Sequence, residues 1–440
     1  MNSNSARQWY LSGLFLLLMS NVISAFLAAV GVQGFAFYHV EAILLCLCGT
    51  QFCVVLLSFG ARRTIDSTVF RFLLISLLYT IVSSVFLLRF GDIGPAYVAL
   101  IIHTLVFYPA TALLMIGCAR PHDATGPAGI PNWILWGAIA ILLFGWMQYL
   151  VGDPILEVAN ADNVSKMVAA NVLGTFRPSS VFASSFQFGL FSVLAFCIAF
   201  SHAVFGRSGV LAWILSMLAL SGVALSQTRN VFLCALCCAT SLAFLVRWRK
   251  RGGRMRLFRF APFAYMLGSV GMMVYAVIHF LGSDMTKTGD LADASSTWAR
   301  VSSWQQAWHD IVLRGSLLDS LFGYGITQAG QASDYRNLYP ARAEGLFIDN
   351  SFVNLFLLQG VVGLLIFVLL WWIIWKRLLK RTQETWDPLA VGITAFYSTF
   401  LAAGVFNILN GQWWGITLAL SLFVLSRPQK TAELRLSCAA

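Results

Sequence analysis

Apolar runs of roughly 20 residues recur along this chain of 440 residues, with short polar turns between them. A helix of that length crosses a hydrocarbon core about 30 Å thick. Inside lipid, only helices and closed barrels satisfy every backbone polar group. Since 59% of the residues are hydrophobic and only 11% are charged, the composition excludes a soluble domain of this size. The sequence predicts an all-α polytopic membrane protein, with residues 1–440 forming a single integral membrane domain.

The apolar runs predict about twelve transmembrane helices. The first run is too long for the apolar core of a signal peptide and lacks a convincing cleavage site, so we interpret it as a retained helix. The predicted spans lie near residues 11–31, 36–58, 68–90, 95–118, 132–152, 181–204, 209–226, 229–247, 259–282, 351–376, 388–409 and 411–427.

Basic residues distinguish the two sides of the predicted bundle. Lys and Arg gather in "ARRT" (61–64), "GRSG" (206–209), "RWRKRGGRMRLFR" (247–259) and "KRLLKR" (376–381), which fall on one side. The positive-inside rule makes that side cytoplasmic and places both termini there. The net charge of +11 therefore reflects membrane topology, and we expect no nucleic-acid partner.

Two large loops lie on the opposite, outward side, at 153–180 and 283–350. The second contains "SSTWARVSSWQQAWHDIVLRG", in which Trp298, Trp304 and Trp308 recur at helical spacing. We predict an amphipathic helix near 296–314 that lies in the membrane interface, where tryptophan is favoured.

Three outward arginines stand beside predicted helix ends: Arg177, Arg229 and Arg300. A single arginine there is usually a solvated or snorkelling side chain. Three together indicate a site, because charges at this depth are costly. Guanidinium groups bind phosphate oxygens bidentately. The pattern favours a lipid carrier whose pyrophosphate lies at this depth and whose polyprenyl tail lies between the helices.

An acid, Asp349, follows the second large loop in "FIDNSF", at the start of the next predicted helix. It can serve as a helix cap or as a general base that takes a proton from a sugar hydroxyl, with Asn350 orienting it or the substrate. Neither outward loop carries a recognisable metal-binding motif, and we expect neither a metal nor a cofactor. The C-x-x-C of Cys234 and Cys237 lies inside an apolar run, so we interpret its thiols as packing groups.

Five segments, in this order, resemble the O-antigen ligase and polymerase superfamily of bacterial envelope-polysaccharide enzymes. Each is degenerate, but their order and common membrane side make the resemblance fairly specific, from about residue 175 to residue 370. The segments are "TFRPSSVF", "LSQTRNVFL", "STWARVSSWQQA", "SLFGYGI" and "DNSFVNLFLLQGVVGLLIF".

The resemblance implies an all-helical glycosyltransferase of the C type in the bacterial inner membrane, with its active site facing the periplasm and no metal requirement. It would transfer glycan from undecaprenyl pyrophosphate to an acceptor hydroxyl. Arg229 and Arg300 match the two arginines that contact the pyrophosphate, and Asp349 completes the predicted catalytic set. The predicted substrate-binding residues are Arg177, Ser179, Trp304, Gly323, Tyr324, Gly325 and Asn350.

Asp349 stands where the ligases of this superfamily commonly have histidine. This departure favours a polymerase of exopolysaccharide or O-antigen, whose acceptor is the terminal sugar of another lipid-linked repeat unit. The alternatives are an O-antigen ligase acting on lipid A-core, a protein O-oligosaccharyltransferase, and a transporter or flippase for lipid-linked sugars. A polymerase implies a flippase and a chain-length regulator as possible partners.

Overall fold

The computed structural model describes residue 15, scattered residues from 68 to 82, and segments 132–152, 176–182, 184–206, 209–251, 257–282, 316–323, 350–406 and 411–425. Within these residues the regular structure is helical, without a strand. The helices are α7 (Asn132–Val151), α9 (Ser185–Phe205), α10 (Val210–Leu225), α11 (Arg229–Arg251), the 3-10 turn η4 (Leu257–Phe260), α12 (Ala261–Gly282), α14 (Leu317–Phe322), α17 (Ser351–Thr385), α18 (Pro388–Phe406) and α19 (Gly411–Leu425).

Five of these helices are long and apolar enough to cross a membrane: Trp133–Val151, Ser185–Phe205, Arg229–Lys250, Gln359–Thr385 and Pro388–Val405. Helix α10 and residues Gly415–Leu425 of α19 are shorter apolar helices. The predicted spans from residue 132 onward each coincide with an observed helix, and most of their ends differ by only a few residues. The four earlier predicted spans lie outside the described residues, apart from isolated positions, as does the predicted interfacial helix at 296–314.

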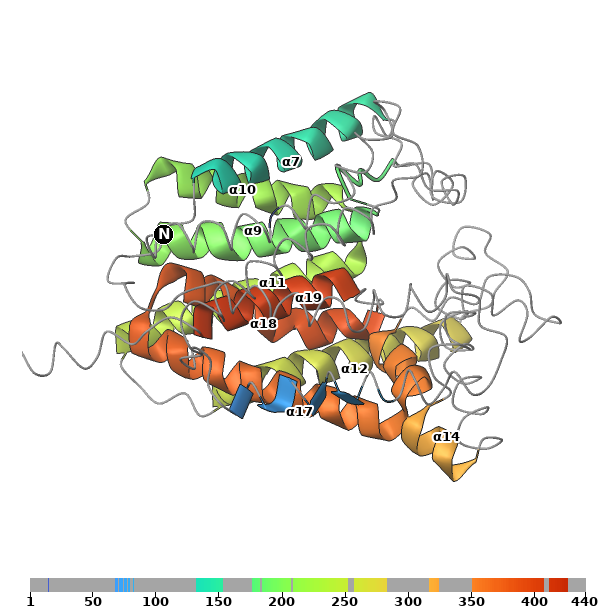
Figure 1. The fold of residues 1–440 in the computed structure, drawn as a ribbon. Helices are drawn as coiled ribbons and strands as arrows, with labels where there is room; N and C mark the ends of the chain where they lie inside the picture. The colour runs from blue at the N-terminus through green and yellow to red at the C-terminus, as the bar shows by residue number, and fades with distance from the viewer. Residues whose placement is uncertain are drawn as a thin grey trace, which may run out of the picture.

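Helix α18 lies at the centre of the described bundle and packs against α9, α11, α12 and α17 (Figure 1). Its span is almost entirely buried by protein. Helix α7 lies at the periphery, where Trp136, Leu143 and Leu150 are exposed. Apolar side chains exposed in this way suit contact with lipid, whereas the small and polar side chains of α18 suit contact with other helices.

Small residues allow the helices to approach closely. A Cβ at Gly189 in α9 would lie 2.5 Å from a methyl of Val231 in α11, and one at Gly222 in α10 would lie 2.5 Å from Ser192 Oγ. Hydroxyl groups then join helices across the apolar core. Ser241 Oγ of α11 lies 2.8 Å from Ser398 Oγ of α18. Such contacts between small and polar residues stabilise helix association where lipid provides no hydrophobic driving force.

Aromatic side chains join three helix ends at one end of the bundle. The ring of Trp386, the C-cap of α17, stacks on Phe205 of α9 at 6.1 Å and meets Trp248 of α11 edge-on at 6.1 Å. Arg249 Cζ lies 5.2 Å from the centre of the Phe205 ring. Trp375 Nε1 donates to the Arg259 carbonyl at 2.8 Å, which ties η4 to the same end. The basic segments 247–251, 257–259 and 376–381 therefore gather together.

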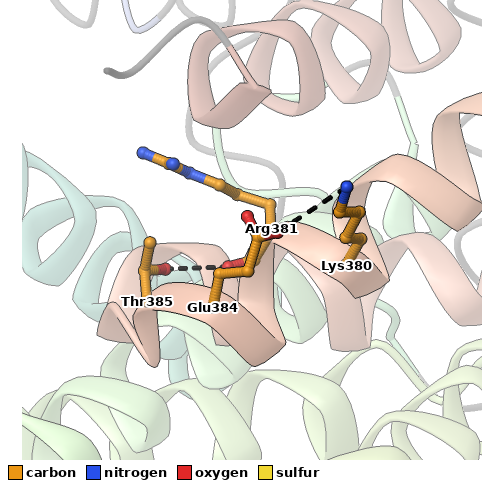
Figure 2. A network of polar contacts seen from close by, with 4 residues as sticks. All are labelled: Lys380, Arg381, Glu384 and Thr385. Atoms are coloured by element: carbon orange, nitrogen blue, oxygen red, sulfur yellow. Dashed lines mark hydrogen bonds and ion pairs between the residues drawn. The ribbon is translucent and has the colours of Figure 1, made fainter. Parts of the chain in front are cut away.

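The last turns of α17 are polar and extend that helix beyond its predicted end at 376 (Figure 2). Lys380 Nζ lies 3.8 Å from Glu384 Oε1, and Thr385 Oγ1 donates to the Arg381 carbonyl at 3.0 Å. The Arg381 side chain extends away from the ion pair (Figure 2). An i, i+4 ion pair and a side-chain bond to the backbone therefore support the helix after its apolar run has ended.

Helix α17 is interrupted at Gly360, where φ is 63° and ψ is −166°. The backbone of α14 packs against this break, and a Cβ on Gly360 would lie 2.4 Å from the Leu321 carbonyl. Tyr79 Oη donates a hydrogen bond of 2.8 Å to the carbonyl of Gln359. A residue from an early helix thus provides a donor for a carbonyl next to the break, as a non-aqueous environment requires.

We expect Gly360→Ala to destabilise the protein by more than about 2 kcal/mol, because alanine is strained at positive φ and its methyl group would overlap the α14 backbone. The measurement is the unfolding temperature of the purified protein in detergent. Gly268→Ala is the matched control, since a Cβ added at Gly268 in α12 would meet no heavy atom of the other described elements within 4 Å. Equal unfolding temperatures for the two variants would contradict this account of the break.

Candidate functional site

The end of the bundle opposite the basic segments carries the described candidate residues (on the right in Figure 1). It consists of the segment 176–182, the starts of α9, α11, α17 and α19, the ends of α7, α10, α12 and α18, and the short helix α14. The predicted residues found there are Arg177, Ser179, Arg229, Gly323 and Asn350. Arg300, Trp304, Tyr324, Gly325 and Asp349 lie outside the described residues.

The segment containing Arg177 is held on α7 by the side chain of Gln148. The Ser180 backbone N–H donates to Gln148 Oε1 at 2.7 Å, and Gln148 Nε2 donates to the Ser180 carbonyl at 3.1 Å. Ser180 Oγ donates to the Ile141 carbonyl at 2.7 Å. Gln148 and Ser180 are both buried. Three hydrogen bonds therefore fix one residue of the segment onto α7.

An aromatic anchor holds the far end of the same segment. Phe182 is buried, and its ring lies 5.2 Å from that of Phe191 in α9 and 6.4 Å from that of Trp413 in α19. The Phe182 N–H donates to the Ser179 carbonyl at 3.0 Å, closing a tight turn. The segment 176–182 is thus fixed by α7 on one side and by α9 and α19 on the other.

Arg177 is half-buried, and its Nε is a buried donor without a hydrogen-bond partner within the described structure. Leaving a buried donor unsatisfied costs about 1–3 kcal/mol, and more for a charged group. A buried polar group without a partner needs an explanation, and binding of a ligand is one such explanation. An anion with oxygen acceptors would satisfy both the charge and the donor.

Arg229 is the first residue of α11, and its side chain is exposed. The turn before it is closed by its own side chains: Thr228 Oγ1 donates to the Ser226 carbonyl at 2.9 Å, and Ser226 Oγ donates to the Val223 carbonyl at 2.8 Å. A cation at a helix N-terminus opposes the helix dipole. Its position therefore does not stabilise α11 through the helix dipole.

Asn350 is the N-cap of α17. Its Oδ1 accepts hydrogen bonds from the backbone N–H groups of Phe352 and Val353 at 2.8 and 3.1 Å, and its Nδ2 donates to the Val405 carbonyl at 2.8 Å. The side chain therefore caps α17 and ties its start to the end of α18. Of the two roles that the sequence leaves open for Asp349, the capping role belongs to Asn350. The predicted contact of Asn350 with substrate stays a prediction.

Gly323 ends α14 in a left-handed conformation, with φ of 80°. A Cβ on Gly360 would lie 2.6 Å from the Gly323 backbone nitrogen, so the two glycines lie close together where α14 meets the break in α17. Gly323 therefore has a structural position, at the contact between α14 and the break in α17.

The described residues contain no group of three His, Cys, Asp or Glu side chains that could hold a metal ion. Four of the cysteines, Cys197, Cys234, Cys237 and Cys238, are buried and free. Cys238 Sγ lies 3.6 Å from Thr399 Oγ1 and 3.7 Å from the Ala395 carbonyl, so it packs between α11 and α18. Cys234 and Cys237, which form the C-x-x-C, are buried and free, which agrees with their interpretation as packing residues.

Comparison of the chain with known proteins gives no matching family model and no matching curated protein. The superfamily resemblance therefore rests on the five quoted segments alone.

The sequence analysis missed one residue of this end, Gln148. The signal for it was a lone amide within the apolar run "WILWGAIAILLFGWMQYLV". A polar side chain inside a transmembrane segment is expensive to bury and therefore has a partner or a function. The partner, Ser180, lies 32 residues further along the chain, in the segment 176–182, which the pattern of a single helix cannot reveal.

We expect Asn350→Asp to destabilise the protein by about 1–3 kcal/mol, although Asp is as good an N-cap as Asn. The substitution removes the donor to Val405 and places a carboxylate oxygen against its carbonyl. The measurement is chemical or thermal unfolding in detergent. Ser184→Asp is the matched control, because exposed Ser184 caps α9 by accepting from the Gln187 N–H, and Asp retains that bond. Unfolding of Asn350→Asp at the wild-type temperature would rule out the tie to α18.

Proposed function

We propose that this protein is a polysaccharide polymerase that transfers glycan from undecaprenyl pyrophosphate to the terminal sugar of another lipid-linked repeat unit. The proposal extends the resemblance of the five segments to the O-antigen ligase and polymerase superfamily. Its substrates are two copies of a lipid-linked oligosaccharide, and its products are a longer lipid-linked chain and free undecaprenyl pyrophosphate.

The observation that carries the proposal concerns the Arg177 Nε, which is buried and has no partner among the described residues. It lies at the end of the bundle where Arg229 begins α11. A planar guanidinium binds two phosphate oxygens at once, which suits a pyrophosphate at the membrane surface. In the proposed reaction Arg177, Arg229 and Arg300 hold the pyrophosphate and stabilise its charge as it leaves. This is electrostatic catalysis by preorganised donors.

The acceptor sugar is activated by Asp349 in this proposal. Its hydroxyl oxygen bonds to the anomeric carbon of the donor as the bond from that carbon to the pyrophosphate oxygen breaks, and the hydroxyl proton passes to Asp349. We expect inversion at the anomeric carbon. The capping of α17 by Asn350 supports this role, because a capping carboxylate from Asp349 is not needed to satisfy the Phe352 and Val353 N–H groups.

The proposal includes the parts of the fold that extend beyond the described residues. These are about twelve transmembrane helices in a C-type glycosyltransferase arrangement, both termini in the cytoplasm, and an active site at the periplasmic face of the inner membrane. The gathering of basic segments at the end opposite Arg177 and Arg229 supports this orientation, because cytoplasmic loops are rich in Lys and Arg. A flippase would supply the substrate, and a chain-length regulator would act on the product.

We expect Arg229→Ala to abolish long-chain polymer in a strain that lacks the native gene, with protein levels unchanged, and Arg229→Lys to impair it because lysine lacks the planar fork. The measurement is glycan analysis of carrier-linked and surface polysaccharide. Arg247→Ala is the matched control, since Arg247 is also exposed and lies near the other end of the same helix.

The products in the deletion strain separate the function classes. Single repeat units accumulating on the carrier indicate a polymerase, and full polymer left on undecaprenyl pyrophosphate indicates a ligase. Repeat units retained at the cytoplasmic face indicate a transporter. Normal polymer length with Arg229→Ala would refute the proposed role of that arginine.

We expect Asp349→Asn to reduce turnover by at least about 100-fold, because general-base catalysis contributes about 10²–10⁴ and an amide cannot accept the proton. The unfolding temperature should stay near that of the wild type, since Asn350 provides the cap. The assay is single-turnover transfer with purified protein and a lipid-linked donor. Wild-type turnover with Asn at position 349 would eliminate the general-base role.

A further inference from the structure

Gln148 is fully buried at the end of α7, and both ends of its amide bond one backbone residue, Ser180. The side chain therefore forms a two-point clamp on the loop, not a tie between two helices. Ser180 follows Arg177 by two intervening residues, the first of which is Pro178. Because proline fixes φ and Pro178 is buried, the path from Ser180 back to Arg177 has few free dihedrals. A displacement of the Gln148 side chain would therefore also displace the backbone of Arg177.

Ser180 also carries backbone strain, with φ of 52° in the left-handed region. A residue other than glycine in that region costs roughly 1–3 kcal/mol and persists only where its surroundings determine it fully. Here the surroundings are the two bonds to Gln148 and the bond from Ser180 Oγ to Ile141. Strain maintained in this way accompanies preorganised sites, and this one lies three residues after Arg177, whose Nε is buried.

We propose that Gln148 is a positioning residue for donor binding: through Ser180, it holds the Arg177 guanidinium where the pyrophosphate of the donor binds. This inference rests on the proposed function and extends it to a residue of α7. Gln148 itself contacts no substrate. Its amide replaces the water that would otherwise satisfy the Ser180 N–H and carbonyl, so the backbone at Ser180 is held in place before the donor arrives. Preorganisation of this kind raises affinity by reducing the ordering cost of binding.

The test uses the full-length protein in lipid nanodiscs with a polyprenyl-pyrophosphate-linked oligosaccharide as donor. We expect Gln148→Met to raise the KM for donor by about 10–100-fold with a smaller change in kcat, since misplacement of a binding group by about 1 Å costs up to about 100-fold. Inhibition by inorganic pyrophosphate should weaken by a similar factor. A merely structural role would lower the amount of folded protein and leave both constants of the folded fraction unchanged.

A double-mutant cycle shows whether Gln148 acts through Arg177. In an Arg177→Ala background, Gln148→Met should have little further effect on KM, because the group that it positions is already absent. Equal effects in both backgrounds would overturn the proposal. Ser221→Ala is the matched control: it removes the acceptor of Trp146 Nε1, 2.8 Å away, and so breaks a tie between α7 and α10 without touching the loop. Its KM should equal that of the wild type.

A second variant covers failure of Gln148→Met to fold. Gln148→Asn keeps a neutral amide at the buried position but is one methylene shorter, so it cannot bond both the N–H and the carbonyl of Ser180 in their present places. It should show an intermediate KM, and a wild-type KM would count against the clamp. If the wild-type protein does not turn over the pyrophosphate-linked donor, the proposed function fails. If the wild type does, and both Gln148 variants have its KM, only the positioning role fails.

Discussion

A backbone polar group inside an apolar environment must find its partner within the protein, and the described structure follows from this constraint. Straight helices satisfy it internally, so side chains are needed where helices begin, end or break. Tyr79 donates to the Gln359 carbonyl at the break in α17, and Asn350 accepts from two N–H groups at its start. In the segment 176–182, Gln148 donates to the Ser180 carbonyl and accepts from the Ser180 N–H. Each of these side chains fixes the place of a non-helical backbone segment.

The same ties assemble the candidate site. The start of α17 is bonded to the end of α18, the most enclosed helix of the described bundle. The Arg177 segment is bonded to α7 and packed on Phe191 and Trp413. Flexible arginine side chains thus extend from backbone that is rigid on several sides. Binding groups on such supported backbone keep the geometry that catalysis requires. The apolar core provides rigidity, and the helix ends carry the candidate residues.

The sequence predicted the helices from residue 132 onward well, because the length of an apolar run is a local property. It did not predict the break at Gly360, since "LLQGVVGLL" reads as a continuous run and only contact with α14 makes a left-handed residue favourable. The partners that fix the site lie far along the chain: 32 residues separate Gln148 from Ser180, 55 separate Asn350 from Val405, and 280 separate Tyr79 from Gln359. Pairings of this kind depend on the folded arrangement, so the sequence indicated a role for Asn350 but not its cap.

The break at Gly360 also makes the orientation of the side chains after it independent of the length of the helix before it. Every residue added to an unbroken helix rotates all later side chains by about 100°, so a change near Asn350 would turn the aromatic face of Trp371 and Trp375 away from its neighbours. The non-helical backbone at Gly360 interrupts this dependence of the later side chains on the earlier residues. The first piece, before Gly360, can therefore change its length or composition while the second piece keeps its contacts with Tyr397 and Phe263.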